Sequence, residues 1–202
     1  SSDIFDLASI TKVISTTSGI MKLVDKNKID LDKPVVSYLP NFKGKKKKYK
    51  KQKSEITVRD LLSHSSGLPA FKQYFKMEKT RGVILENIYD TEPVREKGDT
   101  TIYSDVGAIM LGELIEKASG FPLDIFVDSL IFKPLGMGTT FYNPPEEKIK
   151  RVIPTEIDPK GNLIHGYVHD ENAHSLGGVA GHAGLFSTAK DLAIFSQMML
   201  NK

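Results

Sequence analysis

The sequence predicts a mostly helical fold of the α+β class, and three observations support this. Apolar residues recur at near-helical spacing from about residue 8 to 26 and again from 104 to 120. Strand signals are sparse along the rest of the chain. Hydrophobic residues make up 40% and charged residues 26% of the 202 positions, which suits one globular domain or a large part of one.

The first helix is expected from about Ala8 to Lys26. Its middle, Ser15 to Gly19, consists of poor helix formers, and small residues there would let a neighbouring element pack closely. The next segment, IDLDKPVVSYLPNF, reads as a turn and a short extended piece, with prolines as stops.

Two later helices carry clear end signals. In SEITVRDLLSHSSGLP, Thr57 and Asp60 resemble a capping box, and Gly67 then Pro69 should end the helix. In YSDVGAIMLGELIEKASGFP, Ser104 or Asp105 can cap the start and Gly120 the end.

The last third is expected to alternate helix and loop. A helix and a tight turn should follow Pro122, and residues 138–170 read as loop with short strands. The segment GGVAGHAGLF is too glycine-rich for a helix. The final helix should begin at Ser187 or Thr188, where Thr188 and Asp191 form a second capping-box pattern.

Residues 43–53, KGKKKKYKKQK, hold eight lysines and no acid. Without them the formal net charge would be −5 instead of +3, so the basic excess is local. The simplest interpretation is a solvated surface loop. The functional alternative is a patch that attracts a cell-wall polymer, lipid headgroups or nucleic acid. One interrupting aromatic, Tyr49, is too little for a base-stacking platform.

Composition excludes several classes of protein. There is no run of 18 apolar residues, so no membrane span is expected. The start, SSDIFDLAS, lacks the basic and apolar regions of a signal peptide, so the protein is cytosolic or a leader has been removed. Cysteine is absent, which excludes disulfides and thiol catalysis.

The stretch ASITK places Ser9 three residues before Lys12, on one face of the first helix. A serine hydroxyl becomes a good nucleophile when a base removes its proton. A lysine can do so near neutral pH where burial or a nearby positive charge lowers its pKa from about 10.4. With 16 serines and 24 lysines, chance predicts about two such pairs, and Ser187–Lys190 is the second. That second serine looks like a helix cap.

A serine–lysine site of this type needs a third polar element that carries the proton to the leaving group. Tyr103-Ser104-Asp105 stands at the start of the clearest helix, from which a tyrosine can reach a cleft. The structural alternative is an aromatic residue buried beside an N-cap.

The five histidines do not suggest a metal site. Four of them, His165, His169, His174 and His182, fall in a loop-like region, where the four-residue spacing of His165 and His169 does not make a helical pair, so no metal is expected. His64 is expected to be a packed structural residue.

Taken in order, these segments resemble the serine β-lactamase and penicillin-binding-protein-like family, in its class C and esterase branch. The resemblance covers nearly the whole chain, and LLSHSSGLP and the glycine-rich run into LFSTAKDLAIF are its most specific parts. The stretch HDENAHSLGGVAGHAGLFSTA looks most like versions fused behind a family 3 β-N-acetylglucosaminidase.

The resemblance implies catalytic roles. Ser9 would be acylated, Lys12 would take its proton, and Tyr103 would relay a proton to the leaving group. Asp105 stands at a substrate-binding position where many members have asparagine. An aspartate there adds a negative charge that favours the protonated form of the lysine, which argues against strong β-lactamase activity.

The family's third element is Lys-Thr-Gly or His-x-Gly on a strand that lines the site. His182-Ala183-Gly184 matches these letters but precedes LFSTAKDLAIF, so the true element is expected beyond Lys202, and the first sheet strands before Ser1. Residues 1–202 would then be the helical part of a β-lactamase/transpeptidase-like domain with most of its antiparallel sheet missing. Because an oxyanion-hole donor is worth about 10²–10³ in rate, this piece alone should have little or no activity.

The leading hypothesis is a serine hydrolase that forms an acyl-enzyme on an ester or amide, such as a D-Ala-D-Ala peptide. Its partners would be a small-molecule or peptidoglycan-derived substrate and the remainder of its own domain. No cofactor and no nucleic acid are implied, and the cell envelope is the expected location. Two alternatives stay open: a degenerate cell-wall interaction module, or a passenger domain behind a glycoside hydrolase, whose paired acids do not stand out here.

Overall fold

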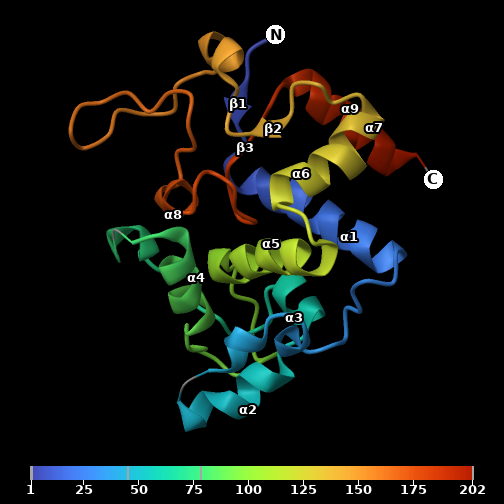
Figure 1. Cartoon of the computed structure of the whole chain (residues 1–202), viewed down its shortest axis with the longest axis vertical. Coiled ribbons are helices and arrows are strands. Elements are labelled where there is room, and N and C mark those ends of the chain that lie inside the picture. Colours follow the sequence, from blue (N-terminus) through green and yellow to red (C-terminus); the bar gives the residue numbers. More distant parts are fainter. Residues whose placement is uncertain (1, 45, 78, 202) are drawn as a thin grey trace.

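Figure 1 shows the computed structural model, which describes residues 2–44, 46–77 and 79–201, with Lys47 and Lys48 as backbone only. Helix α5 (Asp105–Ser119) crosses the middle of the molecule. The three short strands lie on one side of it with α6, α7 and α9, and helices α2 and α3 lie on the other (Figure 1).

The helix expected over residues 8–26 is confirmed, but its geometry changes along its length. A 3₁₀ turn, η1 (Ala8–Ile10), leads into a π-helix, η2 (Lys12–Thr17), and then into α1 (Ser18–Asp25). The hydroxyls of Thr17 and Ser18 each donate to a carbonyl five residues back, at 2.8 and 3.2 Å. The poor helix formers of the sequence therefore support a wide π turn, a feature that often marks functional sites.

Close packing against this helix is also confirmed. A Cβ added to Gly19 would lie 2.8 Å from the Cδ1 atom of Ile115 in α5. Helix α5 begins as expected, because Ser104 is its N-cap and accepts a hydrogen bond from the N–H of Gly107 at 3.1 Å. Gly120 ends it with φ of 80°, the left-handed conformation that glycine adopts most easily.

Of the two predicted capping boxes, the first forms in full and the second in part. At α3 (Val58–Leu62), Thr57 and Asp60 exchange both hydrogen bonds, although the helix ends before Gly67. At α9 (Ala189–Leu200), Thr188 accepts from the N–H of Asp191, as predicted. The Asp191 carboxylate instead accepts from the N–H and hydroxyl of the 139–140 segment, at 2.8 and 2.9 Å, and ties α9 to the strand region.

The segment after Pro122 is helical as expected: α6 (Leu123–Val127), η6 (Asp128–Phe132) and α7 (Lys133–Leu135), closed by a turn at Gly136. The strands are β1 (Phe5–Asp6), β2 (Phe141–Tyr142) and β3 (Leu185–Ser187), which pair antiparallel in the order β1-β3-β2. The 3₁₀ helix η7 (Glu146–Arg151) follows β2. This small sheet and the dominant helix confirm the α+β class.

Two local predictions are wrong. The extended piece expected within residues 29–42 is largely 3₁₀, as η3 (Val35–Ser37) and η4 (Pro40–Lys43), because prolines pre-set φ for such turns. The lysine-rich segment is not a loop: α2 (Lys47–Glu55) covers most of it, since lysine is a good helix former. Lys45 and the side chains of Lys47 and Lys48 lie outside the described residues.

Four further helical elements were not predicted from the sequence: η5 (Tyr74–Met77), α4 (Arg81–Tyr89), α8 (Glu171–Ser175) and η7, which lies in the segment expected to be loop with short strands. Within the described residues, no helix has the length and apolar character needed to cross a membrane.

Candidate active site

Ser9 lies exposed on a tight turn that joins β1 to the first helix. Ala8 just before it has φ of 44°, and the Asp6 carboxylate accepts the Ala8 N–H at 2.8 Å, which holds this turn. Lys12 lies one turn further on and is buried, with 7% of its surface exposed. Its Nζ is 2.9 Å from the Ser9 Oγ. The structure therefore brings the predicted pair into direct hydrogen-bond contact.

The Lys12 Nζ has three oxygen neighbours from three distant parts of the chain. Besides the Ser9 Oγ, it lies 3.1 Å from the backbone carbonyl oxygen of His182 and 2.7 Å from the Oδ1 of Asp105. The Nζ donates hydrogen bonds to the Ser9 Oγ and to the His182 carbonyl. Asp105, the first residue of α5, forms an ion pair with Lys12, but its Oδ1 accepts no hydrogen bond from the described residues.

Tyr103 lies beside this cluster. The centre of its ring is 4.8 Å from the Lys12 Nζ, and its side chain is 54% exposed, so it is not the buried aromatic of the structural alternative. The His64 ring packs against it with 4.8 Å between ring centres, and the His64 Nδ1 accepts the N–H of Ser104 at 3.1 Å. His64 is thus a packed residue next to the site.

Burial lowers the pKa of His64, and the positive charge of Lys12 lowers it further, against an opposing effect of Asp105. A neutral His64 ring keeps its Nδ1 free to accept the Ser104 N–H. The ring therefore supports the start of α5, where Tyr103 and Asp105 are placed.

The glycine-rich segment 177–184 forms the third wall of the site, which the sequence did not predict. A Cβ added to Gly181 would lie 2.1 Å from the carbonyl oxygen of Ala108 in α5. The Thr16 hydroxyl donates to the Gly181 carbonyl at 2.7 Å. The Tyr142 hydroxyl donates to the Ala180 carbonyl at 3.2 Å. This close packing brings the next carbonyl, that of His182, to Lys12.

The second serine–lysine pair is not a site. Ser187 is buried in β3 and hydrogen-bonds the Thr140 hydroxyl at 2.7 Å, while Lys190 is exposed on α9. Ser187 is not the cap of α9, since Thr188 has that position.

The four clustered histidines have separate partners. The Nε2 atoms of His165, His169 and His182 lie 2.8–2.9 Å from the Val152 carbonyl, Glu156 and Asp170. The His174 ring packs on Tyr167. Among the described residues no group of three or more metal-ligating side chains comes together.

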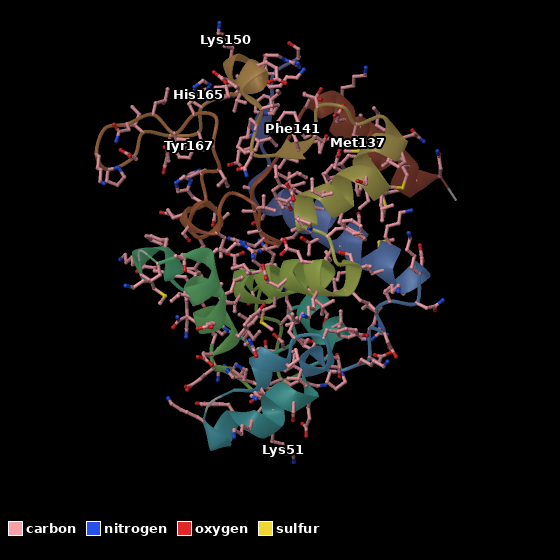
Figure 2. All side chains as sticks on the ribbon, viewed as in Figure 1. Lys51, Met137, Phe141, Lys150, His165 and Tyr167 are labelled. Atoms are coloured by element: carbon pink, nitrogen blue, oxygen red, sulfur yellow. The ribbon has the colours of Figure 1, made fainter. Side chains whose placement is uncertain are left out.

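The described part of the lysine-rich segment, residues 43–53, lies at the opposite end of the molecule from His165. Figure 2 shows Lys51 on α2 at one end of the long axis, with Lys150 and His165 at the other. Lys53, its last lysine, is fully buried, and its Nζ donates to the carbonyls of Tyr89 and Thr91 at 2.5 and 3.0 Å. Lys46 pairs with Glu92 at 2.7 Å. At least these two lysines therefore have internal partners.

Comparison with known families agrees with this geometry. The model of the Beta-lactamase family matches residues 2–202. The chain belongs to this family. The resemblance inferred from the ordered segments is therefore confirmed, whereas the fusion to a glucosaminidase stays a prediction.

Curated proteins include relatives of the chain. It is 38% identical over 220 residues to a Bacillus subtilis (strain 168) protein named "N-acetylmuramyl-L-alanine amidase", with 98% of this chain and 50% of that protein covered. It is 36% identical over 220 residues to an Escherichia coli (strain K12) protein named "Putative D-alanyl-D-alanine carboxypeptidase", with 98% and 51% covered. The chain thus spans about half the length of these relatives.

Solved structures share the fold of the chain. FmtA from Staphylococcus aureus matches with a TM-score of 0.78 at 22% identity, over 98% of this chain and 53% of that one. A class C β-lactamase from Rhodobacter sphaeroides matches with a TM-score of 0.75 at 20% identity, over 99% and 52%. The octameric penicillin-binding protein homologue from Pyrococcus abyssi matches with a TM-score of 0.74 at 25% identity, over 99% and 46%.

Proposed function

We propose that the chain belongs to a serine hydrolase that forms an acyl-enzyme on Ser9, with Lys12 as the base. The observation that carries this proposal is the 2.9 Å contact between the exposed Ser9 hydroxyl and the buried Lys12 Nζ. A nucleophile and its base within hydrogen-bond reach is the arrangement that covalent catalysis requires.

The surroundings of Lys12 fit this role. A neutral amine has two N–H donors and one lone pair. The His182 carbonyl takes one of these donors, which allows the lone pair to be directed at the Ser9 hydroxyl. Lys12 acts as the base in its neutral form.

The reaction then runs in two steps. The Ser9 Oγ attacks the carbonyl carbon of the substrate while its proton moves to the Lys12 Nζ, and the leaving group departs with a proton delivered through Tyr103. Water then attacks the acyl-Ser9 ester, gives up a proton to the base, and releases the acid and free Ser9. Tyr103 suits the relay because its ring lies 4.8 Å from Nζ and is partly exposed.

For the substrate we propose an amide or ester of a cell-wall peptide, and for the location the cell envelope. The names of the relatives, an amidase and a D-alanyl-D-alanine carboxypeptidase, support this class. Asp105 would also border the bound substrate, because it starts α5 next to Lys12 and Tyr103. We expect weak β-lactamase activity at most, because the negative charge of Asp105 lies 2.7 Å from the Lys12 Nζ.

We also propose that residues 1–202 are the helical part of a longer domain. The curated relatives are about twice as long as the matched region, and the sheet has three strands of two or three residues among the described residues. The rest of the domain would supply the remaining strands and the oxyanion hole.

The test is to treat the full-length protein with a fluorophosphonate probe and to map the adduct by mass spectrometry. We expect one adduct on Ser9 and none in Ser9→Ala. Labelling that survives in Ser9→Ala at the wild-type rate would overturn the assignment.

The Lys12–Asp105 ion pair favours a second candidate, a non-catalytic module that binds cell-wall material through a degenerate site. An assay with a p-nitrophenyl ester distinguishes the two candidates. A Ser9-dependent burst of p-nitrophenol from the full-length protein excludes the non-catalytic module. The predicted glycoside hydrolase fusion is tested by the sequence that precedes Ser1 in its gene.

A further inference from the structure

The buried histidine of the glycine-rich segment has a role that the proposed mechanism does not yet use. The His182 side chain is 1% exposed, and its Nε2 lies 2.8 Å from the Oδ1 of Asp170. The other ring nitrogen, Nδ1, is buried and has no partner among the described residues. This pattern assigns the tautomer with the proton on Nε2, since an ionised Asp170 carboxylate can only accept a hydrogen bond.

Asp170 is itself firmly held. Its Oδ1 accepts the N–H of Ala173 at 2.8 Å, which makes it the N-cap of α8. Burial raises the pKa of Asp170, but the hydrogen bond from His182, the Ala173 N–H and the charge of Lys12 outweigh burial and keep the pKa below its usual value. The carboxylate therefore stays charged and gives His182 a strong anchor.

The backbone of the same histidine contacts Lys12. Its carbonyl oxygen lies 3.1 Å from the Lys12 Nζ, across 170 positions of sequence. Gly181, which comes before this carbonyl, packs against α5, whereas Gly184, two residues after His182, has φ of 113°. Because glycines leave the backbone free to rotate, an anchored side chain between them restricts this peptide group further.

We infer that His182 is a positioning residue: its ring, anchored on Asp170, holds its own carbonyl against the Lys12 Nζ. This inference rests on the proposed role of Lys12 as the base. The carbonyl takes one amine N–H, so that the lone pair of the neutral amine is directed at the Ser9 Oγ. The letters His182-Ala183-Gly184, which resemble the family's third element, would thus serve as an anchor from the interior of the domain.

The test follows the ammonium protons of Lys12 in the full-length protein by ¹⁵Nζ NMR, with the signal assigned through Lys12→Arg. Wild-type Lys12 should exchange slowly with water, because its donors are bonded and buried. His182→Leu should speed this exchange and lower kcat for ester hydrolysis about ten- to hundredfold at nearly unchanged KM. His182→Gln, whose Nε2 can still donate to Asp170, should keep both the slow exchange and the kcat close to the wild-type values.

Two internal controls distinguish this effect from a general loss of rigidity in the protein. His169→Leu removes a histidine–carboxylate pair of the same kind, 2.8 Å to Glu156, that is exposed and does not contact Lys12. The Nζ signal of buried Lys53 should stay unchanged in every variant. If His182→Leu does not fold, Asp170→Ser replaces it, because serine can still cap α8 but is too short to reach the His182 ring.

Unchanged exchange and kcat in a folded His182→Leu would overturn the inference, as would equal changes in His169→Leu. A wild-type protein that the fluorophosphonate probe does not label at Ser9 would overturn the proposed hydrolase function instead. The exchange of the Lys12 protons would still decide whether His182 positions this side chain.

Discussion

At the residue scale, the proposed base Lys12 lies beside a negative charge. The Asp105 Oδ1 is 2.7 Å from the Lys12 Nζ and forms an ion pair with it. Because a carboxylate attracts a positively charged amine and the proposed acylation step needs the neutral amine, we expect this ion pair to slow the acylation of Ser9.

Asp105→Asn should accordingly raise the rate of Ser9 acylation, because it removes the negative charge beside the Lys12 amine. Asparagine keeps the shape of the side chain. The measurement is the second-order rate of probe labelling from pH 5 to 9.

Asp32→Asn is the matched control, because it also removes one carboxylate of an ion pair, that with Arg59, at an exposed position. It should leave the labelling rate unchanged. A slower reaction of Asp105→Asn across the whole pH range would contradict this account of Asp105.

His64 predicts a dependence of stability on pH. Its pKa in the folded protein lies below 6.5, so the ring stays neutral while the unfolded chain takes up a proton. Stability should therefore fall as pH drops below about 6.5. In His64→Asn the melting temperature should fall less between pH 7 and 5, since asparagine tolerates the left-handed φ of 57° and offers an acceptor to Ser104. Equal slopes in both proteins would contradict it.

The local part of the site could be predicted from the sequence, and the distant part could not. Ser9 and Lys12 are three residues apart, and Tyr103 and Asp105 stand at a recognisable helix start. The His182 contact joins positions 170 apart through a backbone carbonyl, which every residue has, so no residue type marks it. The burial of Lys53 could not be predicted for the same reason, because its partners are also backbone carbonyls and the other lysines of its segment suggest a solvated surface.

At the element scale, the glycine-rich segment sets the distance between α5 and the first helix. Gly181→Ala should push this segment from α5, because the new Cβ would meet the Ala108 carbonyl oxygen at 2.1 Å. We expect a loss of about 1–3 kcal/mol in unfolding free energy and slower acylation of the protein that stays folded. Urea unfolding and labelling measure the two effects.

Gly138→Ala is the control for this prediction, because no atom lies within 4 Å of its added Cβ. It should change stability by less than about 0.5 kcal/mol. A Gly181→Ala protein as stable and reactive as Gly138→Ala would show that the packing does not set the site.

Helix α2 is tied to α4 by a buried amine. Burial lowers the pKa of Lys53 to about 8, so the unfolded chain binds more protons than the folded one between about pH 8 and 10.5. Stability should rise with pH in this window. Lys53→Met should flatten the rise by about 1–2 kcal/mol, allowing for partial solvent screening. The comparison uses urea unfolding at pH 7 and 10, and identical slopes would contradict it.

The helices that could be predicted are those with local end signals. The Thr57–Asp60 box and the Ser104 cap each depend on residues three apart. Helix α4 lacks such a signal, because the Thr80 side chain makes no cap hydrogen bond and the helix is held by tertiary contacts such as Arg81 to Glu113, 2.5 Å away. Asp191 shows the reverse case. Its carboxylate was predicted to complete a capping box, but it accepts hydrogen bonds from residues 139–140 instead.

At the scale of the whole molecule, the candidate site lies where separate parts of the chain meet. The turn after β1 supplies Ser9 and Lys12, the start of α5 supplies Tyr103 and Asp105, and the segment before β3 supplies the His182 carbonyl. Figure 1 shows α5 between the strand region and the lower helices, so this junction depends on the packing of both. A site built this way is sensitive to the whole fold.

The central claim is that Ser9 and Lys12 act together as nucleophile and base. The most direct measurement is the pre-steady-state burst of p-nitrophenol released from an ester by the full-length wild type, Ser9→Ala and Lys12→Met. We predict a burst close to one equivalent per wild-type molecule and none from either variant within the same time. A wild-type burst that persists in Lys12→Met, or in Ser9→Ala, would contradict the account.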